Sequence, residues 1–172
     1  GAFMILLAEP FVRFMWGEDW ILVADFLPYF GLLVLLQTLL STVGNIYIIY
    51  DQEKMLFRIG GITAVVMIAA IISGAMFSAI HVARFYALSY ILFTVPLNLV
   101  VGFVKTIKFD PKKVARFWGP KMLLFLGIFV SIWADNIIVT SLLLFLYMFH
   151  ILILQWSDLL KVLKTIRNRI RK

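Results

Sequence analysis

The chain of 172 residues contains no cysteine, and only nine of its residues are acidic against 16 lysines and arginines. The absence of cysteine excludes disulfide bonds, thiolate nucleophiles and cysteine-based metal sites. Low-complexity segments are also missing, and no stretch has the composition of a water-soluble domain. Apolar residues are abundant instead and make up 63% of the chain, whereas soluble proteins contain about 45–50%. Together with a mean hydropathy of +1.02, this excess predicts that lipid is the solvent for most of the chain.

Five long apolar segments predict an all-α membrane protein built as an antiparallel bundle of five transmembrane helices. The segments lie at about 21–50, 55–78, 82–104, 112–133 and 137–156, with short linkers between them. The first segment is longer than the roughly 20 residues that cross a bilayer. Pro28 and Gly31 near its start therefore predict a kink. The whole bundle is expected to occupy residues 18–157.

Residues 1–17 precede this bundle and are apolar up to a polar boundary, which reads AEPFVRFMWGEDW. They are too few to cross a bilayer, so we predict that they are the end of a truncated, sixth transmembrane helix. A short re-entrant segment is the alternative. Trp16 and Trp20 suit the headgroup layer, and Glu9 and Arg13 are four residues apart on one helical face, where they can pair.

Lysine and arginine are distributed unequally between the two ends of the predicted spans. One end has only Arg13 and Arg84, together with most of the acidic residues, among them Asp25 and Asp135. By the positive-inside rule the other end is cytoplasmic. We therefore predict a multi-pass protein of the cell inner (cytoplasmic) membrane with a cytoplasmic C-terminus. The predicted cytoplasmic end has 14 of the 16 basic residues: Lys54, Arg58, Lys105, Lys108, Lys112, Lys113, Arg116, Lys121, Lys161, Lys164, Arg167, Arg169, Arg171 and Lys172.

The last 15 residues, 158–172, read DLLKVLKTIRNRIRK and alternate between apolar and basic positions with helical spacing. One face carries apolar residues, and basic residues occupy most of the remaining positions. The apolar residues are Leu159, Val162, Leu163, Ile166 and Ile170. This pattern is typical of a basic amphipathic helix that lies on an anionic membrane surface. The alternative is a solvated tail that only ends the last span.

Three stretches of the sequence resemble a known family. They read LLAEPFVRFMWGEDW, then GLLVLLQTLLSTVGNIYIIYDQEKMLFRIGG, then SGAMFSAIHVARFYALSYILFTVPLNLVVG. Together they resemble the C-terminal lobe of Wzx-type polysaccharide flippases, which belong to the MATE/MOP exporter superfamily. The resemblance covers roughly residues 5–105, while residues 106–172 match only as two more apolar spans and a basic tail. The first stretch is also similar to lipid II flippases, so the resemblance defines the family better than the substrate.

The resemblance implies part of a transporter that flips polyprenyl-linked oligosaccharides across the membrane for cell-surface polysaccharide export. It implies a second, N-terminal lobe of the same protein as a partner, with substrate carried between the lobes by alternating access. Membrane lipid and the lipid-linked oligosaccharide are the other expected partners. A multidrug or lipid II exporter of the same superfamily, or a non-transporting membrane assembly subunit, is the alternative.

Two stripes of polar side chains run along predicted spans, and such residues are costly in lipid unless they are paired or face water. Positions four apart share a helical face, so each stripe points in one direction. The stripes are candidates either for a cavity wall that binds sugar hydroxyls or for hydrogen bonds between helices. The first consists of Gln37, Ser41 and Asn45, and the second of Tyr86, Tyr90, Thr94 and Asn98.

Three ionisable residues also lie within or near the spans. Arg84 is a candidate contact for a pyrophosphate-linked substrate, with snorkelling to lipid headgroups as the alternative. Asp25 is a candidate for ion coupling, or a partner of Arg84 or Arg13. His150 lies deep in an apolar segment, where a hydrogen bond to a neighbouring helix competes with a functional role.

An enzyme would need paired carboxylates, a metal cluster or a nucleophile with a base. The two histidines, His81 and His150, are far apart in the sequence, and no HExxH or Walker A motif is present. We therefore expect no catalytic residue, metal or cofactor. The positive charge is explained by membrane topology, so we expect no nucleic-acid partner. A cavity rich in acids would favour a drug exporter, and cations with hydroxyl-binding groups would favour a glycolipid flippase.

Overall fold

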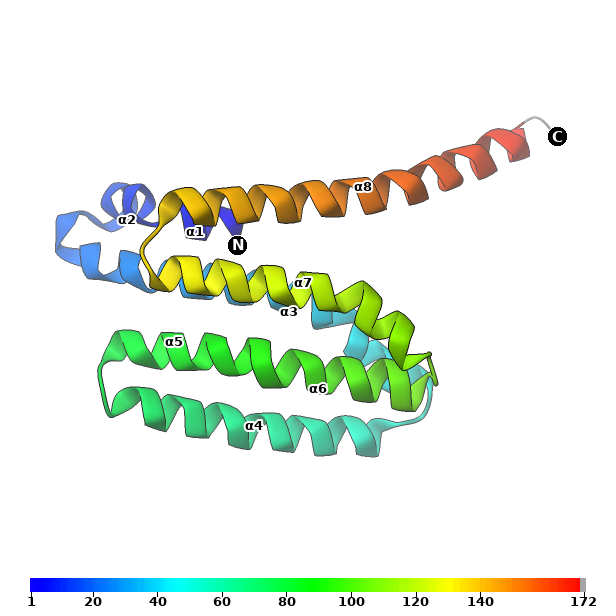
Figure 1. The fold of residues 1–172 in the computed structure, drawn as a ribbon, viewed down its shortest axis with the longest axis horizontal. Helices are drawn as coiled ribbons and strands as arrows, with labels where there is room; N and C mark the ends of the chain where they lie inside the picture. The colour runs from blue at the N-terminus through cyan, green and yellow to red at the C-terminus, as the bar shows by residue number, and fades with distance from the viewer. Residues whose placement is uncertain (171–172) are drawn as a thin grey trace.

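The computed structural model describes the backbone of residues 1–170 and the side chains of residues 1–153, except those of Leu39 and Thr42. This part of the chain is all-helical (Figure 1). The eight α-helices are α1 (Ala2–Leu6), α2 (Ala8–Trp16), α3 (Leu27–Ile49), α4 (Glu53–Ala75), α5 (Ala79–Ser89), α6 (Val95–Leu99), α7 (Pro111–Trp133) and α8 (Ile137–Ile170). Three further helical segments are not α-helical. The 3-10 segment η1 (Glu18–Asp25) lies between α2 and α3, and the π-helical segments η2 (Tyr90–Thr94) and η3 (Val100–Thr106) lie before and after α6.

Four helical rods in the described part of the chain are long and apolar enough to cross a membrane. They are α3, α4, the continuous rod Ala79–Thr106 and α7. These rods confirm the all-α class and match four of the five predicted spans. In α8 the apolar part within the described side chains is shorter, Ile137–Ile153, while the helix backbone continues to Ile170. The fifth span and the division of the chain at residues 17 and 157 remain predictions.

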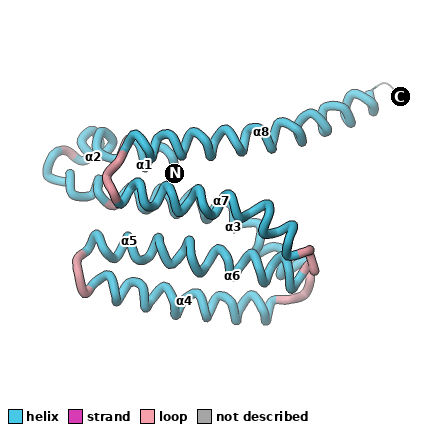
Figure 2. Tube along the Cα trace, in the orientation of Figure 1, coloured by secondary structure: helices cyan, strands magenta, loops and turns pink. Residues whose placement is uncertain are grey.

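The rods lie side by side and are joined by short loops at the two ends of the bundle (Figure 2). The rod of α5 and α6 lies between α4 and the pair α3 and α7, and α8 packs on α7 (Figure 1). The main apolar core contains fully buried side chains from α3, the central rod and α7, among them Leu36, Ile91 and Phe125. This arrangement brings α3 and α5 into contact, although α4 lies between them in the sequence.

Proline and glycine near the start of α3 act differently from the predicted kink. The long first segment is divided into η1 and α3, and Pro28 lies in the first turn of α3. There the missing N–H of proline leaves no helical hydrogen bond unmade, so Pro28 is accommodated in the first turn of a helix that begins at Leu27. Gly31 allows close packing instead, because an added Cβ would lie 2.6 Å from the backbone oxygen of Gly1.

The N-terminal segment forms two helices, α1 and α2, which meet at Leu7. The helix α1 packs against α3, and α2 packs against η1. Arg13 joins the two sides of the turn at Gly17, since its guanidinium lies 2.8 Å from Glu9 and 2.9 Å from Glu18. The predicted pair of Glu9 and Arg13 is thereby confirmed.

Candidate functional site

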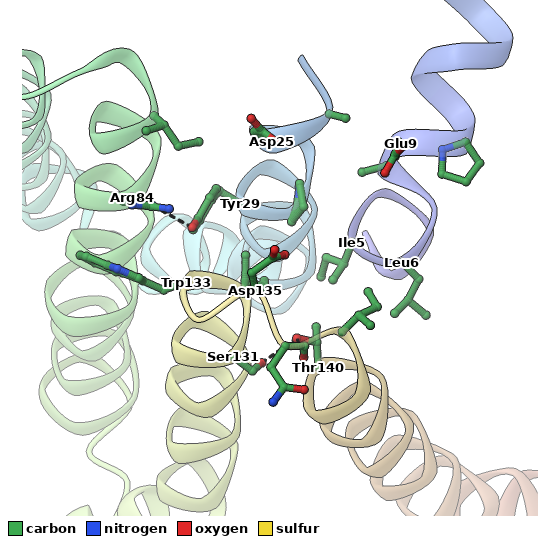
Figure 3. A pocket seen from close by; sticks show the side chains of 18 of the residues that line it. Ile5, Leu6, Glu9, Asp25, Tyr29, Arg84, Ser131, Trp133, Asp135 and Thr140 are labelled. Atoms are coloured by element: carbon green, nitrogen blue, oxygen red, sulfur yellow. Dashed lines mark hydrogen bonds between the residues drawn. The ribbon is translucent and has the colours of Figure 1, made fainter. Parts of the chain in front are cut away.

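A cavity of about 680 Å³ opens at the end of the bundle where α2, η1 and the turn between α7 and α8 meet (Figure 3). Its wall combines the apolar side chains of Ile5 and Ile80 with several charged and hydroxyl groups. Because six helices and η1 each contribute to this wall, the cavity is a product of the packed bundle rather than of one segment.

Arg84 on α5 is the cation of this cavity. Its Nε atom donates a hydrogen bond of 2.9 Å to the hydroxyl oxygen of Tyr29 on α3. Its guanidinium carbon lies 5.0 Å from the ring centre of Trp133 on α7 and 5.8 Å from that of Tyr29. Within the described residues this is the one side-chain hydrogen bond of Arg84, and Arg84 lines the cavity. Three spans thus hold one guanidinium at the cavity wall (Figure 3).

Carboxylates outnumber cations along the cavity. Glu9, Asp25 and Asp135 line it with Arg84, and Glu9 is already paired with Arg13. Asp25 was a predicted partner of Arg84 or Arg13, but the ion pairs among the described side chains both join Arg13 to glutamates. Asp25 is exposed, so water and ligands can reach its carboxylate.

Two buried hydroxyls close the cavity between α7 and α8. The Oγ1 atom of Thr140 lies 2.9 Å from the Oγ atom of Ser131, and it also donates to the backbone oxygen of Asn136. Sequence reasoning missed these residues, together with Tyr29 and Trp133. The position of Trp133 at the end of an apolar span was the available signal, because tryptophan at a span end favours the membrane interface.

The two polar stripes lie outside the lining of this cavity. Gln37, Ser41 and Asn45 form an exposed stripe on α3. In the second stripe Thr94 is buried and the other three side chains, Tyr86, Tyr90 and Asn98, are half-buried. The amide of Asn98 donates to the backbone oxygen of Thr94 at 2.8 Å, within its own rod. Of the predicted site residues, the structure therefore brings only Arg84 and Asp25 together.

Two further ionisable residues lie away from the cavity lining. His150 is half-buried on α8. Lys121 on α7, which the sequence assigned to the basic end, is only 4% exposed. Its Nζ atom donates to the backbone oxygen of Phe117 at 3.0 Å and lies 3.3 Å from the centre of that ring. A lysine side chain can point back along its own helix in this way, which places the amine one turn nearer the start of α7.

The fold defines the class of this chain: it is an all-α protein with four candidate membrane-spanning helices, which indicates a multi-pass membrane protein. Comparison with protein-family models, curated proteins and solved structures found no match to the chain. Among the described residues, no three His, Asp or Glu side chains come together as a metal site.

Proposed function

We propose that this chain is part of a membrane transporter that flips polyprenyl-linked oligosaccharides across the cytoplasmic membrane for cell-surface polysaccharide export. In this proposal it is not an enzyme. Its partners are membrane lipid, the lipid-linked oligosaccharide and a further lobe of the same protein, with no nucleic acid. The resemblance of residues 5–105 to polysaccharide flippases supports the family.

The observation that carries the proposal is the position of Arg84. A guanidinium within a membrane span is costly unless it has a functional or structural partner. Here Tyr29 and Trp133 orient the guanidinium through one hydrogen bond and two ring contacts, while the Nη groups keep donors for a ligand. Guanidinium is well suited to phosphate because it offers paired N–H donors. The aromatic rings and hydroxyls beside it are groups that fix the orientation of a ligand in a pocket.

The exposed stripe on α3 gives the proposal a second element. Gln37, Ser41 and Asn45 offer amide and hydroxyl groups from a candidate span. Such groups are stable in a membrane where they face water, substrate or another helix. In a two-lobed exporter the face between the lobes meets these conditions.

The test uses the full reading frame that contains this chain, expressed in cells that lack their own polysaccharide flippase. We expect Arg84→Gln to reduce surface polysaccharide by at least about tenfold, as removal of one charge-assisted contact does. Arg13→Gln is the matched control, because it removes an arginine at the same end of the bundle but outside the cavity lining. Arg84→Lys, which keeps the charge, and the amount of protein in the membrane separate loss of function from loss of folding. Wild-type polysaccharide in cells with Arg84→Gln would contradict the proposal.

A multidrug exporter of the same superfamily is the second candidate, and the acidic residues of the cavity favour it. Asp25, Asp135 and Glu9 line the cavity with a single cation, and carboxylates attract cationic drugs. The same expression system distinguishes the two. Resistance to cationic drugs that Asp25→Asn and Asp135→Asn remove would identify a drug exporter, whereas restored polysaccharide would identify the flippase.

A further inference from the structure

Seven exposed lysines and arginines gather at the end of the bundle opposite the cavity, and we call them the basic surface. They come from the start of α4, the end of η3 with its following turn, and the start of α7. The loops that join α3 to α4 and η3 to α7 lie at this same end (Figure 1). The residues are Lys54, Arg58, Lys105, Lys108, Lys112, Lys113 and Arg116.

Buried apolar contacts hold these three elements together. Tyr47 of α3, Ile59 of α4 and Val101 of η3 belong to one buried cluster. The turn before α7 is tied to η3, since the backbone N–H of Phe109 donates to the oxygen of Phe103 at 2.9 Å and the two rings make an edge contact. The basic side chains are therefore attached to a packed corner of the bundle, not to a free loop.

The basic surface has an excess of positive charge. Seven cations share this end with three acids, Asp51, Glu53 and Asp110. Asp110 accepts the backbone N–H of Lys112 as the cap of α7. Among the described side chains, the ion pairs both involve Arg13 at the far end.

Like charges also lie on the same helical faces. Lys54 and Arg58 are four residues apart on α4, and Lys112 and Arg116 are four apart on α7. Cations with this spacing repel each other. An anion bound between them would remove that repulsion.

We propose that the basic surface is a binding site for the headgroups of anionic phospholipids in the leaflet at this end of the bundle. Basic clusters at the ends of membrane helices attract anionic headgroups. Exposed aromatic side chains accompany the cations in sequence: Phe57 precedes Arg58 and is 84% exposed, and Phe117 follows Arg116 and is 51% exposed. A lipid has both parts that this combination fits, a phosphate for the cations and acyl chains for the rings. The inference is independent of the proposed transport function.

The test measures lipid binding to the purified full chain in uncharged detergent, by native mass spectrometry with dioctanoyl phosphatidylglycerol and dioctanoyl phosphatidylcholine. We expect the chain to retain phosphatidylglycerol in preference to phosphatidylcholine. Lys105→Gln should weaken this binding by about fivefold, which corresponds to the loss of one basic contact with an anionic surface. Arg13→Gln, an exposed arginine at the opposite end, is the matched control and should leave it unchanged.

Three results would overturn the proposal. They are equal retention of the two lipids, equal weakening by Arg13→Gln and Lys105→Gln, and complete displacement of the lipid by inorganic phosphate at the lipid concentration. The last result would identify a site for free phosphate instead of a lipid. The triple variant Lys54→Gln, Lys105→Gln, Lys112→Gln should weaken binding further than any single change. If its helicity shows that it does not fold, the three single variants decide, because each side chain is exposed.

Discussion

The Nε atom of Arg84 lies 2.9 Å from the hydroxyl oxygen of Tyr29, and this hydrogen bond joins two candidate membrane spans across 55 residues of sequence. The ring of Tyr29 also makes an edge contact with Phe129 of α7, with 6.0 Å between the ring centres. Tyr29 is 2% exposed, so its hydroxyl has little access to other partners. One tyrosine therefore contacts two other spans at the wall of the cavity.

Removal of this hydroxyl should loosen the bundle. We expect Tyr29→Phe to lower the free energy of unfolding in detergent by about 0.6–2 kcal/mol, the range for one hydrogen bond between membrane helices. Tyr50→Phe is the control, because Tyr50 is 49% exposed at the end of α3. The free energy of unfolding of both variants is measured at increasing concentrations of a denaturing detergent. Equal stability of Tyr29→Phe and the wild-type chain would show that the bond contributes no net energy.

Glycines on α4 should differ sharply in their tolerance of alanine. A Cβ added to Gly74 would lie 2.6 Å from the Cα atom of Val82 on α5, whereas one added to Gly61 meets no atom within 4 Å. Gly74→Ala is expected to lower stability by about 1–3 kcal/mol through overpacking. Gly61→Ala should be neutral or should stabilise the helix by about 0.5–1 kcal/mol. Thermal unfolding of the two variants side by side checks this difference, and a destabilising Gly61→Ala would contradict it.

The exposed stripe on α3 should be accessible to water. The chain has no cysteine of its own, so single cysteines can be placed at Gln37 and Asn45, and the same membranes without an added cysteine give the background labelling. We expect a membrane-impermeant maleimide to label these positions faster than a cysteine at Val65, which is 67% exposed on the apolar surface of α4. The experiment uses membranes that contain the full reading frame. Labelling as slow as at Val65 would place the stripe in lipid or against another helix.

The charge asymmetry predicts the orientation of the bundle. A reporter fused after Lys172, or inserted at Lys108 between η3 and α7, should report a cytoplasmic position. A reporter inserted at Ser78, in the turn between α4 and α5, should report the external side. At each position we compare two reporters, one that is active only in the cytoplasm and one that is active only outside it. Together they assign each end of the bundle to one side of the membrane. An active external reporter after Lys172 would reject the orientation.

The C-terminal tail should lie on the membrane surface. Its side chains fall outside those that the structure describes, so the amphipathic pattern of residues 158–172 remains a prediction. Spin labels placed singly along 159–170 in anionic vesicles should show protection by lipid with a period of 3.6 residues. Uniform exposure to water would support the alternative of a solvated tail.

Local features of the sequence anticipated much of this fold. Apolar runs predicted five spans, four of which the structure matches, and the pair of Glu9 and Arg13 followed from spacing alone. Other local details depended on packing. Pro28 lies in the first turn of α3, and the amine of Lys121 points back along its own helix to the backbone oxygen of Phe117.

The candidate site was less predictable than the spans. Arg84 and Asp25 stood out because charge is rare in apolar segments, whereas Tyr29 and Trp133 looked like ordinary membrane aromatics. Their role depends on contacts across the bundle. The polar stripes were visible from their spacing, but their burial depends on which face each rod presents to its neighbours.

The sequence by itself determined the helical class, the approximate spans and the unequal distribution of charge, because each depends on residues that are near one another in the chain. An apolar run long enough to cross a bilayer must satisfy its own backbone hydrogen bonds, and a helix does so locally. Only the tertiary structure decided that residues 29, 84 and 133 meet at one cavity and that three helix ends form one basic surface. Those contacts join distant parts of the chain, and they exist only once the helices have packed.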